Sequence, residues 1–269
     1  LNNARALYLA GVFFGVDAWK AFARTVMAER LEQLVTVDGF LREGSSHYHL
    51  LVTRWLREIA EAASSGDVAT QSLVAPYLRV MQERGSFWKA GGRFALFGDI
   101  SPDFSPERVL ETVPLAEPSA RSETWPASGW HALREHGFTV FARHEPARPG
   151  PSYPWHQHND VLHVSLYDGD TPLLVDPGRR NYADEDGISG TSAFAHNTFC
   201  LDGCPASPER PNRYPVAWAR TRNVAEWPAP GGEYILRTDG FARFGHGPAE
   251  RRIAVYPDRL VITDAVRAT

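Results

Sequence analysis

Apolar side chains recur at helical spacing through about the first 95 residues. Residues 1–14 place Ala6, Leu7 and Ala10 on one face, followed by Phe13 and Phe14. The same spacing predicts helices over residues 17–36 and about 68–84, and a further helix that begins at a serine N-cap, position 45 or 46. Helices joined by short loops are typical of antiparallel pairs in a bundle, solenoid or toroid.

The character of the sequence changes beyond a polar stretch. Residues 96–127 are rich in proline, serine and charged residues, which predicts a loop, one short helix and a linker. From about 128 onward, short runs rich in valine, phenylalanine, tyrosine and threonine alternate with turn formers, as is typical of antiparallel strands. These runs are FTVFARHE, DVLHVSLY, PLLVDPG, NTFCLDG, AWARTRNVAEW, EYILRTDGF, AERRIAVYP and RLVITDAV. We therefore expect an α+β chain with a helical domain over 1–95, a linker over 96–127 and an antiparallel β-sheet domain over 128–269.

Composition and charge narrow the class of protein. The 269 residues are 43% hydrophobic and 22% charged, which is globular composition, and the net charge of −4 gives no basic surplus for nucleic acid binding. Asp17 and Lys20 end the first apolar stretch before it could span a membrane. The sequence starts without methionine, in what reads as a helix, so we expect a fragment. Cys200 and Cys204 are too few for a disulfide framework, and we expect one buried residue and one turn residue in preference to a local bridge.

A group of histidines and carboxylates offers metal ligands. His156 and His158 are two apart, Asp176 ends the next apolar run and His196 precedes another. Imidazole and carboxylate suit Zn²⁺ or a similar ion. A hairpin turning at residues 168–171 would set Asp176 opposite position 162 or 163, so His163 competes with His158 as its partner. From spacing alone, a metal site and a set of packed or hydrogen-bonded histidines both remain open.

Tyr48 falls in the first turn of the helix predicted to begin at position 45 or 46. The positive end of the helix dipole favours an anion, so we expect a more acidic phenol, suited to shuttling a proton. The alternative is a core residue, because Tyr48 shares helical spacing with Val52, Trp55 and Ile59.

Five segments in this order resemble the heparinase II/III-like polysaccharide lyases, relatives of the heparin, heparan sulfate and alginate lyases. The segments are NNARALYLAGVFFG, DGFLREGSSHYHLLV, ALFGDISPD, HQHNDVLHVSLYDGDTPLLVDPG and AHNTFCLDG, which extend to about residue 203. The resemblance implies part of an (α/α) toroid followed by antiparallel, sandwich-like β-sheets, with the cleft between them. It also implies a lyase that cleaves uronic-acid-containing glycans by β-elimination, with an acidic polysaccharide as partner, in the cell envelope, the periplasm or outside the cell.

Carried over residue by residue, the resemblance implies that Tyr48 and His156 form the catalytic acid–base pair. It implies that His158, Asp176 and His196 hold a structural zinc ion. By their position near these residues, Arg179, Tyr182 and Trp155 are candidates for contacts with the sugar, although Arg179 and Arg180 are equally compatible with solvated loop charges.

One departure from the family pattern keeps other functions open. An aromatic residue and an arginine often precede the AHNT segment in the family, and neither is present in SGTSAFAHNT. This favours a second hypothesis, a non-catalytic glycan-binding module of the same fold. A third hypothesis is a metal-dependent hydrolase with a water molecule on the ion.

Overall fold

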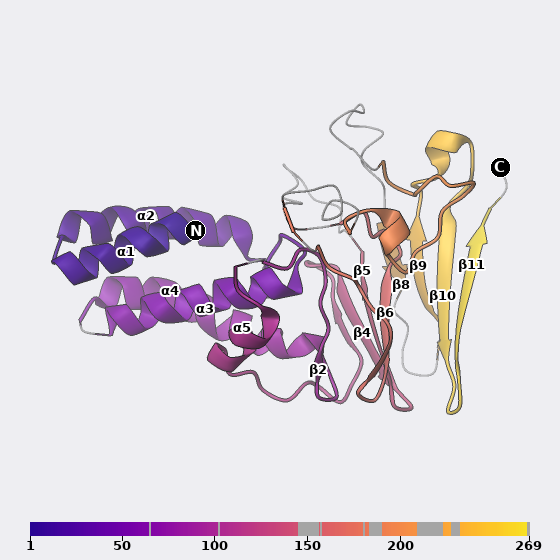
Figure 1. Ribbon diagram of the computed structural model, residues 1–269, viewed down its shortest axis with the longest axis horizontal. Helices are drawn as coiled ribbons and strands as arrows, with labels where there is room; N and C mark the ends of the chain where they lie inside the picture. Colours follow the sequence, from indigo (N-terminus) through magenta and orange to yellow (C-terminus); the bar gives the residue numbers. More distant parts are fainter. Residues whose placement is uncertain are drawn as a thin grey trace.

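Helices form the first part of the chain and antiparallel sheets the second (Figure 1). The computed structural model describes residues 1–64, 66–101, 103–144, 156, 158–179, 181–182, 190–208, 223–226 and 232–267. The helices are α1 (Asn2–Phe14), α2 (Asp17–Leu34), α3 (Ser46–Ala63), α4 (Val68–Gly85) and α5 (Pro106–Thr112). The first four agree closely with the expected ranges.

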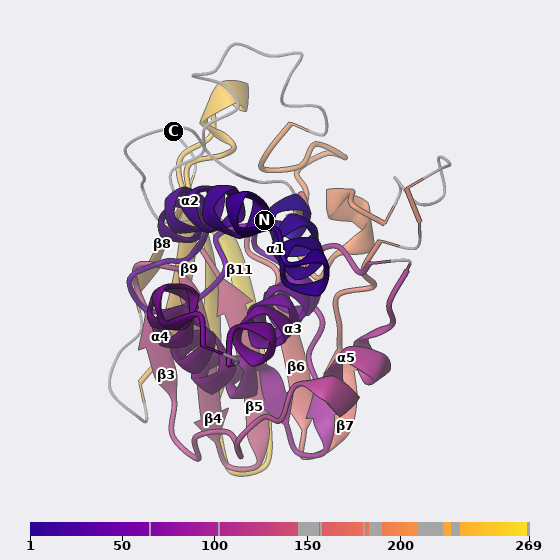
Figure 2. The same ribbon diagram turned by 90° about the vertical axis from the view of Figure 1, so that its left-hand side faces the viewer.

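The first four helices pack as two antiparallel pairs, α1 with α2 and α3 with α4 (Figure 2). Gly15 ends α1 in the left-handed conformation, and the Ser45 side chain caps α3 by accepting the Tyr48 N–H. The two pairs bury a common core, whose fully enclosed members include Tyr8, Met27, Leu31, Leu56 and Ile59. Within the described residues, no helix is both long and apolar enough to cross a membrane.

The strands form two larger antiparallel sheets and one small hairpin. The five-stranded sheet has the order β3 (Glu123–Trp125), β4 (Trp130–Glu135), β5 (Phe138–Arg143), β6 (Val164–Asp168), β7 (Thr171–Leu174). The four-stranded sheet has the order β11 (Leu260–Val266), β10 (Ala249–Val255), β9 (Tyr234–Thr238), β8 (Asn223–Glu226). The hairpin of β1 (Lys89–Ala90) and β2 (Arg93–Phe94) follows a 3-10 turn, η1 (Ser86–Trp88).

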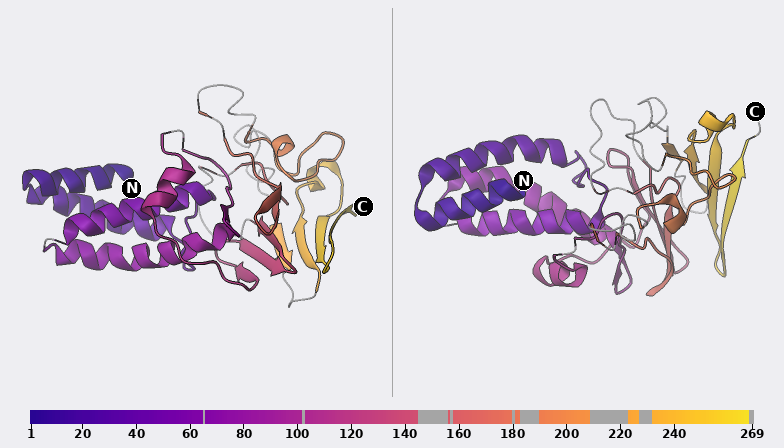
Figure 3. Two further views of the ribbon diagram at one scale, coloured as in Figure 1. Left: turned by 60° about the horizontal axis from the view of Figure 1, so that its bottom comes forward. Right: turned by 45° about the horizontal axis from the view of Figure 1, so that its top comes forward.

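The five-stranded sheet lies between the helices and the four-stranded sheet (Figures 1 and 3). One of its faces packs Trp130 and Phe141 against Phe40, Trp88 and other aromatic residues of the helical half. Its other face contributes to a second core that contains residues of both sheets, including Leu133, Val140, Tyr234, Leu236 and Ile253. Both faces are therefore buried, and the helices and the two sheets are held together as continuous layers.

One strand prediction was wrong, and two strands of the five-stranded sheet were not predicted. Among the residues that the structure describes, the run NTFCLDG forms no ladder beyond an isolated bridge between Leu201 and Cys204, and residues 217–222 of the predicted run AWARTRNVAEW lie outside them. The amide of Asn197 explains part of this, because it donates to the carbonyls of Val164 and Val175 and anchors the segment as a loop. The strands β3 and β4 were not predicted, and β3 lies inside the expected linker. Both cysteines are half-buried, so neither is the fully buried residue that we expected.

His49 on α3 makes the free energy of unfolding depend on pH. Its Nε2–H donates to the Met81 carbonyl at 2.7 Å, and its Nδ1 accepts the Leu41 N–H at 3.2 Å. Burial lowers the pKa of His49 to about 4, so the folded protein keeps the ring neutral. Because the folded pKa lies below the unfolded value, this contribution is complete above about pH 6.5 and is lost as the pH falls toward 4.

We predict that His49 alone reduces the free energy of unfolding by about 2 kcal/mol between pH 7 and pH 5. Urea unfolding of the wild type and of His49→Gln at both pH values measures this term as the difference between their losses of stability. The comparison also removes the contributions of the other buried histidines, which are present in both proteins. An equal loss of stability in the two proteins would contradict the assignment.

Candidate active and metal sites

Tyr48 and His156 come from opposite halves of the chain and lie face to face. Their ring centroids are 3.6 Å apart and the rings are within 8° of parallel. Tyr48 is fixed by the first turn of α3, where Ser45 accepts its N–H and donates its own hydroxyl to the Asp99 carbonyl. The structure thus brings a phenol and an imidazole together, as an acid–base pair requires.

Two carboxylates flank the imidazole of His156. The Nδ1–H group donates to Oδ2 of Asp99 at 3.1 Å, while Nε2 lies 3.6 Å from Oε2 of Glu43. Burial raises the pKa of the Glu43 carboxyl above its ordinary value. At Asp99, burial alone would raise the pKa, but hydrogen bonds from His156, His158 and Tyr182 outweigh it and hold the pKa well below its usual range. Asp99 is therefore ionised at neutral pH.

Tyr182 extends this network to the phenol of Tyr48. Its hydroxyl donates to Oδ2 of Asp99 at 2.8 Å, and its oxygen lies 3.2 Å from the Tyr48 hydroxyl. Because Asp99 can only accept, Tyr48 is the donor in the second contact. The Arg179 guanidinium stacks over the Tyr182 ring at 4.0 Å and lies 3.8 Å from Asp99. Trp155 and Arg180 lie outside the described residues.

The expected acidity of Tyr48 was wrong. Burial raises the pKa of its phenol above the ordinary value, and the nearby charge of Asp99 adds to this. The Tyr48 hydroxyl lies beside Tyr182 and not at the N–H groups at the start of α3. The positive end of the helix dipole therefore does little to lower the pKa of the phenol. Tyr48 is protonated at neutral pH and is ready to donate.

His158, Asp176 and His196 form a buried cluster beside this pair. Three atoms face one another: Nδ1 of His158, Nε2 of His196 and Oδ1 of Asp176. Their separations are 3.1 Å between the nitrogens, and 3.7 Å and 3.4 Å from those nitrogens to the oxygen. All three side chains are fully shielded from solvent.

The outer contacts of these histidines fix where their lone pairs point. Nε2–H of His158 donates to Asp99 at 3.0 Å, and Nδ1–H of His196 donates to the Ser192 carbonyl at 2.7 Å. In the neutral rings, both facing nitrogens therefore carry lone pairs, directed at a carboxylate oxygen. Two lone pairs and a carboxylate in contact require a positive charge between them, which a metal ion would supply.

The donor set and its spacing fit a divalent cation. A tetrahedral ion with ligands at 2.0–2.1 Å keeps its ligand atoms about 3.4 Å apart, close to the separations in the cluster. Burial alone would lower the pKa of His196, but the hydrogen bond and charge of Asp176 raise it to about 9. The raised pKa shows that a positive charge is favoured at His196. A metal ion bound by the converging lone pairs would supply such a charge. The cluster can hold a metal ion.

His163, the competing partner of Asp176, is a packing residue. Its Nδ1 accepts the Asn197 N–H at 3.1 Å and its Nε2 contacts the Ser165 hydroxyl at 3.1 Å. The register shifts between Leu166 and Tyr167, where β7 carries an extra residue, so the simple hairpin pairing does not hold at Asp176. His196 also differs from expectation, because it follows a 3-10 turn, η2 (Ala193–Ala195), and does not begin a strand.

Three residues of the site were not predicted as such: Asp99, Glu43 and Gly98. Gly98 adopts φ +69°, and a Cβ there would lie 2.3 Å from the His156 carbonyl oxygen. Its N–H donates to Oδ2 of Asp176 at 3.0 Å. In the sequence, Asp99 stands in the triplet FGD and Glu43 in the triplet REG, both inside segments that resemble the family. Each triplet holds one acidic residue, and a single residue forms no spacing pattern.

We predict that Gly98→Ala costs at least about 3 kcal/mol of unfolding free energy, from a left-handed φ and a backbone clash. Gly15→Ala is the matched control, because Gly15 has φ +68° and a Cβ added there would meet nothing within 4 Å. That control isolates the conformational cost, about 1 kcal/mol. Chemical denaturation of both variants measures the difference, and equal losses would show that the close approach to His156 is unimportant.

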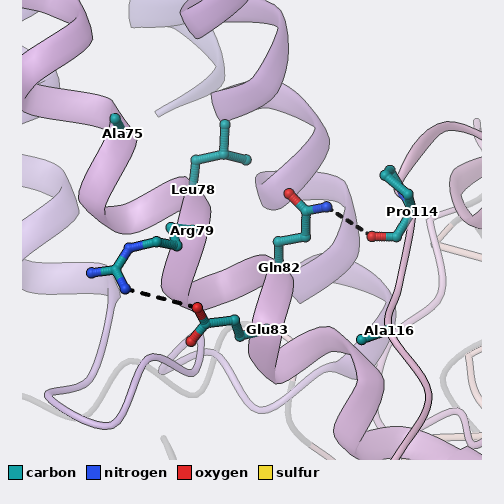
Figure 4. A pocket seen from close by; sticks show the side chains of 7 residues that line it. All are labelled: Ala75, Leu78, Arg79, Gln82, Glu83, Pro114 and Ala116. Carbon is teal, nitrogen blue, oxygen red and sulfur yellow. Dashed lines mark hydrogen bonds and ion pairs between the residues drawn. The ribbon is translucent and has the colours of Figure 1, made fainter.

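A shallow hollow on α4 is separate from these sites (Figure 4). Gln82 bridges it by donating to the Pro114 carbonyl at 2.8 Å, and Arg79 pairs with Glu83 at 3.8 Å. Its lining combines α4 residues with Pro114 and Ala116 from the segment after α5, and none of its side chains belongs to the acid–base or metal cluster.

A helical layer followed by two antiparallel sheets is the arrangement expected for the heparinase II/III-like proteins. A scan against protein families matches residues 117–269 to "Heparinase II/III-like, C-terminal", and the chain belongs to this family. A search of curated protein sequences gives no match.

Solved structures share the fold along nearly the whole chain. A heparinase III gene product superposes with a TM-score of 0.71 at 17% identity, covering 98% of this chain and 44% of the other. A crystal structure of heparinase III gives 0.71 at 15% identity, covering 98% and 46%. The heparan sulfate lyase HepC from Pedobacter heparinus gives 0.63 at 14% identity, covering 98% and 44%. The chain spans less than half the length of these proteins, and the expected fold class, helices followed by sandwich-like sheets, is confirmed.

Proposed function

We propose that the protein is a polysaccharide lyase that cleaves uronic-acid-containing glycans by β-elimination. The observation that carries this proposal is the stacked pair of Tyr48 and His156, one group from the helical half and one from the sheet half. Membership of the heparinase II/III-like family supports the substrate class, an acidic polysaccharide. Such polymers are found outside cells, so we place the protein in the periplasm, in the cell envelope or outside the cell.

Elimination needs a base at C5 of the uronate and an acid at the leaving oxygen on C4. We propose that His156 takes the C5 proton, because its Nδ1–H is hydrogen-bonded to Asp99, which leaves the lone pair on Nε2, 3.6 Å from the Glu43 carboxyl. We propose that Tyr48 protonates the leaving oxygen, and its protonated phenol, stacked against this ring, supports that role. Arg179 and Tyr182 line the same network, and we propose that both contact the sugar, with Arg179 near an anionic group. The proposed contact of Trp155 lies outside the described residues.

We propose zinc as the ion held by His158, Asp176 and His196. Two imidazole nitrogens and one carboxylate oxygen suit Zn²⁺, and each ligand is anchored by a further hydrogen bond, as is common around zinc. When bound, the ion would supply positive charge that fixes the segments carrying these residues. The cluster is fully shielded, whereas a catalytic zinc keeps a position open to substrate. This burial argues for a structural ion and against the hydrolase hypothesis.

The proposal is tested by incubating the full-length protein with alginate, heparan sulfate and other uronans. The ultraviolet absorbance of the unsaturated uronate is expected to rise with at least one of them. Binding of a glycan without any unsaturated product would instead establish the non-catalytic binding module. Cleavage products that lack the double bond would establish a hydrolase.

A further inference from the structure

One buried carboxylate, Asp99, contacts both the acid–base pair and the metal cluster. Its Oδ2 accepts Nδ1–H of His156 at 3.1 Å and the Tyr182 hydroxyl at 2.8 Å. Its Oδ1 accepts Nε2–H of His158 at 3.0 Å. Only 2% of the Asp99 side chain is exposed, so water does not compete for these contacts.

The backbone holds Asp99 in this position from both halves of the chain. Its N–H donates to the His156 carbonyl at 2.9 Å, and its carbonyl accepts the Ser45 hydroxyl at 2.8 Å. It also forms an isolated parallel bridge with Arg179. The carboxylate is therefore fixed relative to α3, to His156 and to the loop that follows β7.

An ionised carboxylate accepts hydrogen bonds and cannot donate them. Each histidine that contacts Asp99 must therefore carry its proton on the contacting nitrogen. This places the proton of His156 on Nδ1 and the lone pair on Nε2, which lies 3.6 Å from Oε2 of Glu43. It places the proton of His158 on Nε2 and leaves the Nδ1 lone pair directed at Asp176 and His196.

We propose that Asp99 is a positioning residue that sets the tautomers of both histidines at once. It holds His156 with a free Nε2 for proton transfer and holds His158 with a free Nδ1 for the metal ion. Metal binding and the orientation of the catalytic imidazole are thereby coupled through one side chain. The part that concerns proton transfer rests on the proposed lyase function, whereas the tautomers and the metal affinity do not.

The wild-type protein gives the first test. Long-range ¹H–¹⁵N spectra of uniformly labelled protein distinguish the two tautomers of a neutral histidine, and His156→Gln and His158→Gln spectra assign the two signals. We expect the Nδ1–H tautomer for His156 and the Nε2–H tautomer for His158. The Nε2–H tautomer at His156 would overturn the proposal, and this result does not require any variant of Asp99 to fold.

Asp99→Asn gives the second test, because the amide offers one acceptor oxygen where the carboxylate offers two. We expect zinc affinity, measured by competition with a chelator, to fall about 10–100-fold. We expect the Nε2–H tautomer to appear at His156, and kcat to fall about 10²–10⁴-fold with a much smaller change in KM. Asp258→Asn, an exposed residue of the β10–β11 turn, is the matched control.

The two readouts separate failure of this proposal from failure of the proposed function. Unchanged tautomers and unchanged zinc affinity in Asp99→Asn would overturn the coupling even if the enzyme is a lyase. Changed tautomers and weakened zinc binding in a protein without lyase activity would uphold the positioning role of Asp99 and reject the catalytic assignment.

Discussion

Tyr48→Phe and His156→Ala are each expected to lower the rate of elimination by about 10²–10⁴-fold, the usual contribution of a general acid or base. Tyr48→Phe removes one hydroxyl and leaves the ring stacked on His156, so packing is preserved. His156→Ala removes the group whose free Nε2 we assign as the base. The measurement is the initial rate of unsaturated product formation at saturating and at low substrate.

Matched substitutions elsewhere control for nonspecific effects. Tyr256→Phe changes a partly exposed tyrosine at the β10–β11 turn, and His246→Ala changes a histidine in the loop before β10. Both are expected to retain the wild-type rate. A Tyr48→Phe or His156→Ala protein that is folded and retains the full rate would remove that residue from the mechanism.

Removal of the metal is expected to lower Tm by about 5–10 °C, because an ion at about a hundred times its dissociation constant contributes about 2.7 kcal/mol. The reason is local: without an ion, only a proton on His196 offsets the Asp176 carboxylate and the facing nitrogen of His158 in a buried cluster. Elemental analysis of the purified protein is expected to give about one zinc per chain, and thermal unfolding with and without a chelator gives the change in Tm.

A ligand variant shows whether the effect arises at this cluster. His196→Ala is expected to lose the metal and to show no further fall in Tm with chelator, whereas His246→Ala is expected to behave like the wild type. The cluster assignment would be contradicted if chelation and added zinc both left the Tm of the wild type unchanged.

Local sequence signals were enough to predict the long helices of the helical half, but not the buried face of α1, where Phe13 and Phe14 are exposed and Tyr8 is buried. The spacing of apolar residues gave the four long helices, and the Ser45 cap placed Tyr48 in the first turn of α3. The same signals did not predict β4, whose sequence WHALRE contains strong helix formers. Because most of its residues are buried, β4 also lacks the alternation of apolar and polar residues that marks a strand with one exposed face. The proposed domain boundaries at 95/96 and 127/128 stay predictions, although β3 in the linker belongs to the five-stranded sheet.

Residues of the site with a distinctive chemical type could be predicted from the sequence. Residues whose role depends on the three-dimensional arrangement could not. His158, Asp176 and His196 were marked as possible metal ligands by their residue types and chosen as a set by the family resemblance, and the structure gathers them. Spacing left His163 in competition with His158, because the sequence does not reveal the extra residue that shifts the β6–β7 register by one. Asp99 was missed because its partners His156 and Tyr182 are 57 and 83 positions away in the sequence.

The most direct test of the proposed chemistry is mass spectrometry of products formed from a uronan in oxygen-18 water. Elimination breaks the bond between C4 and the leaving oxygen without adding water, so we predict an unsaturated product that carries no solvent oxygen. That product should be formed by the wild type and lost in both Tyr48→Phe and His156→Ala. Products that contain one oxygen-18 atom per cleaved bond would contradict the account, because they would show that water attacks the glycosidic linkage.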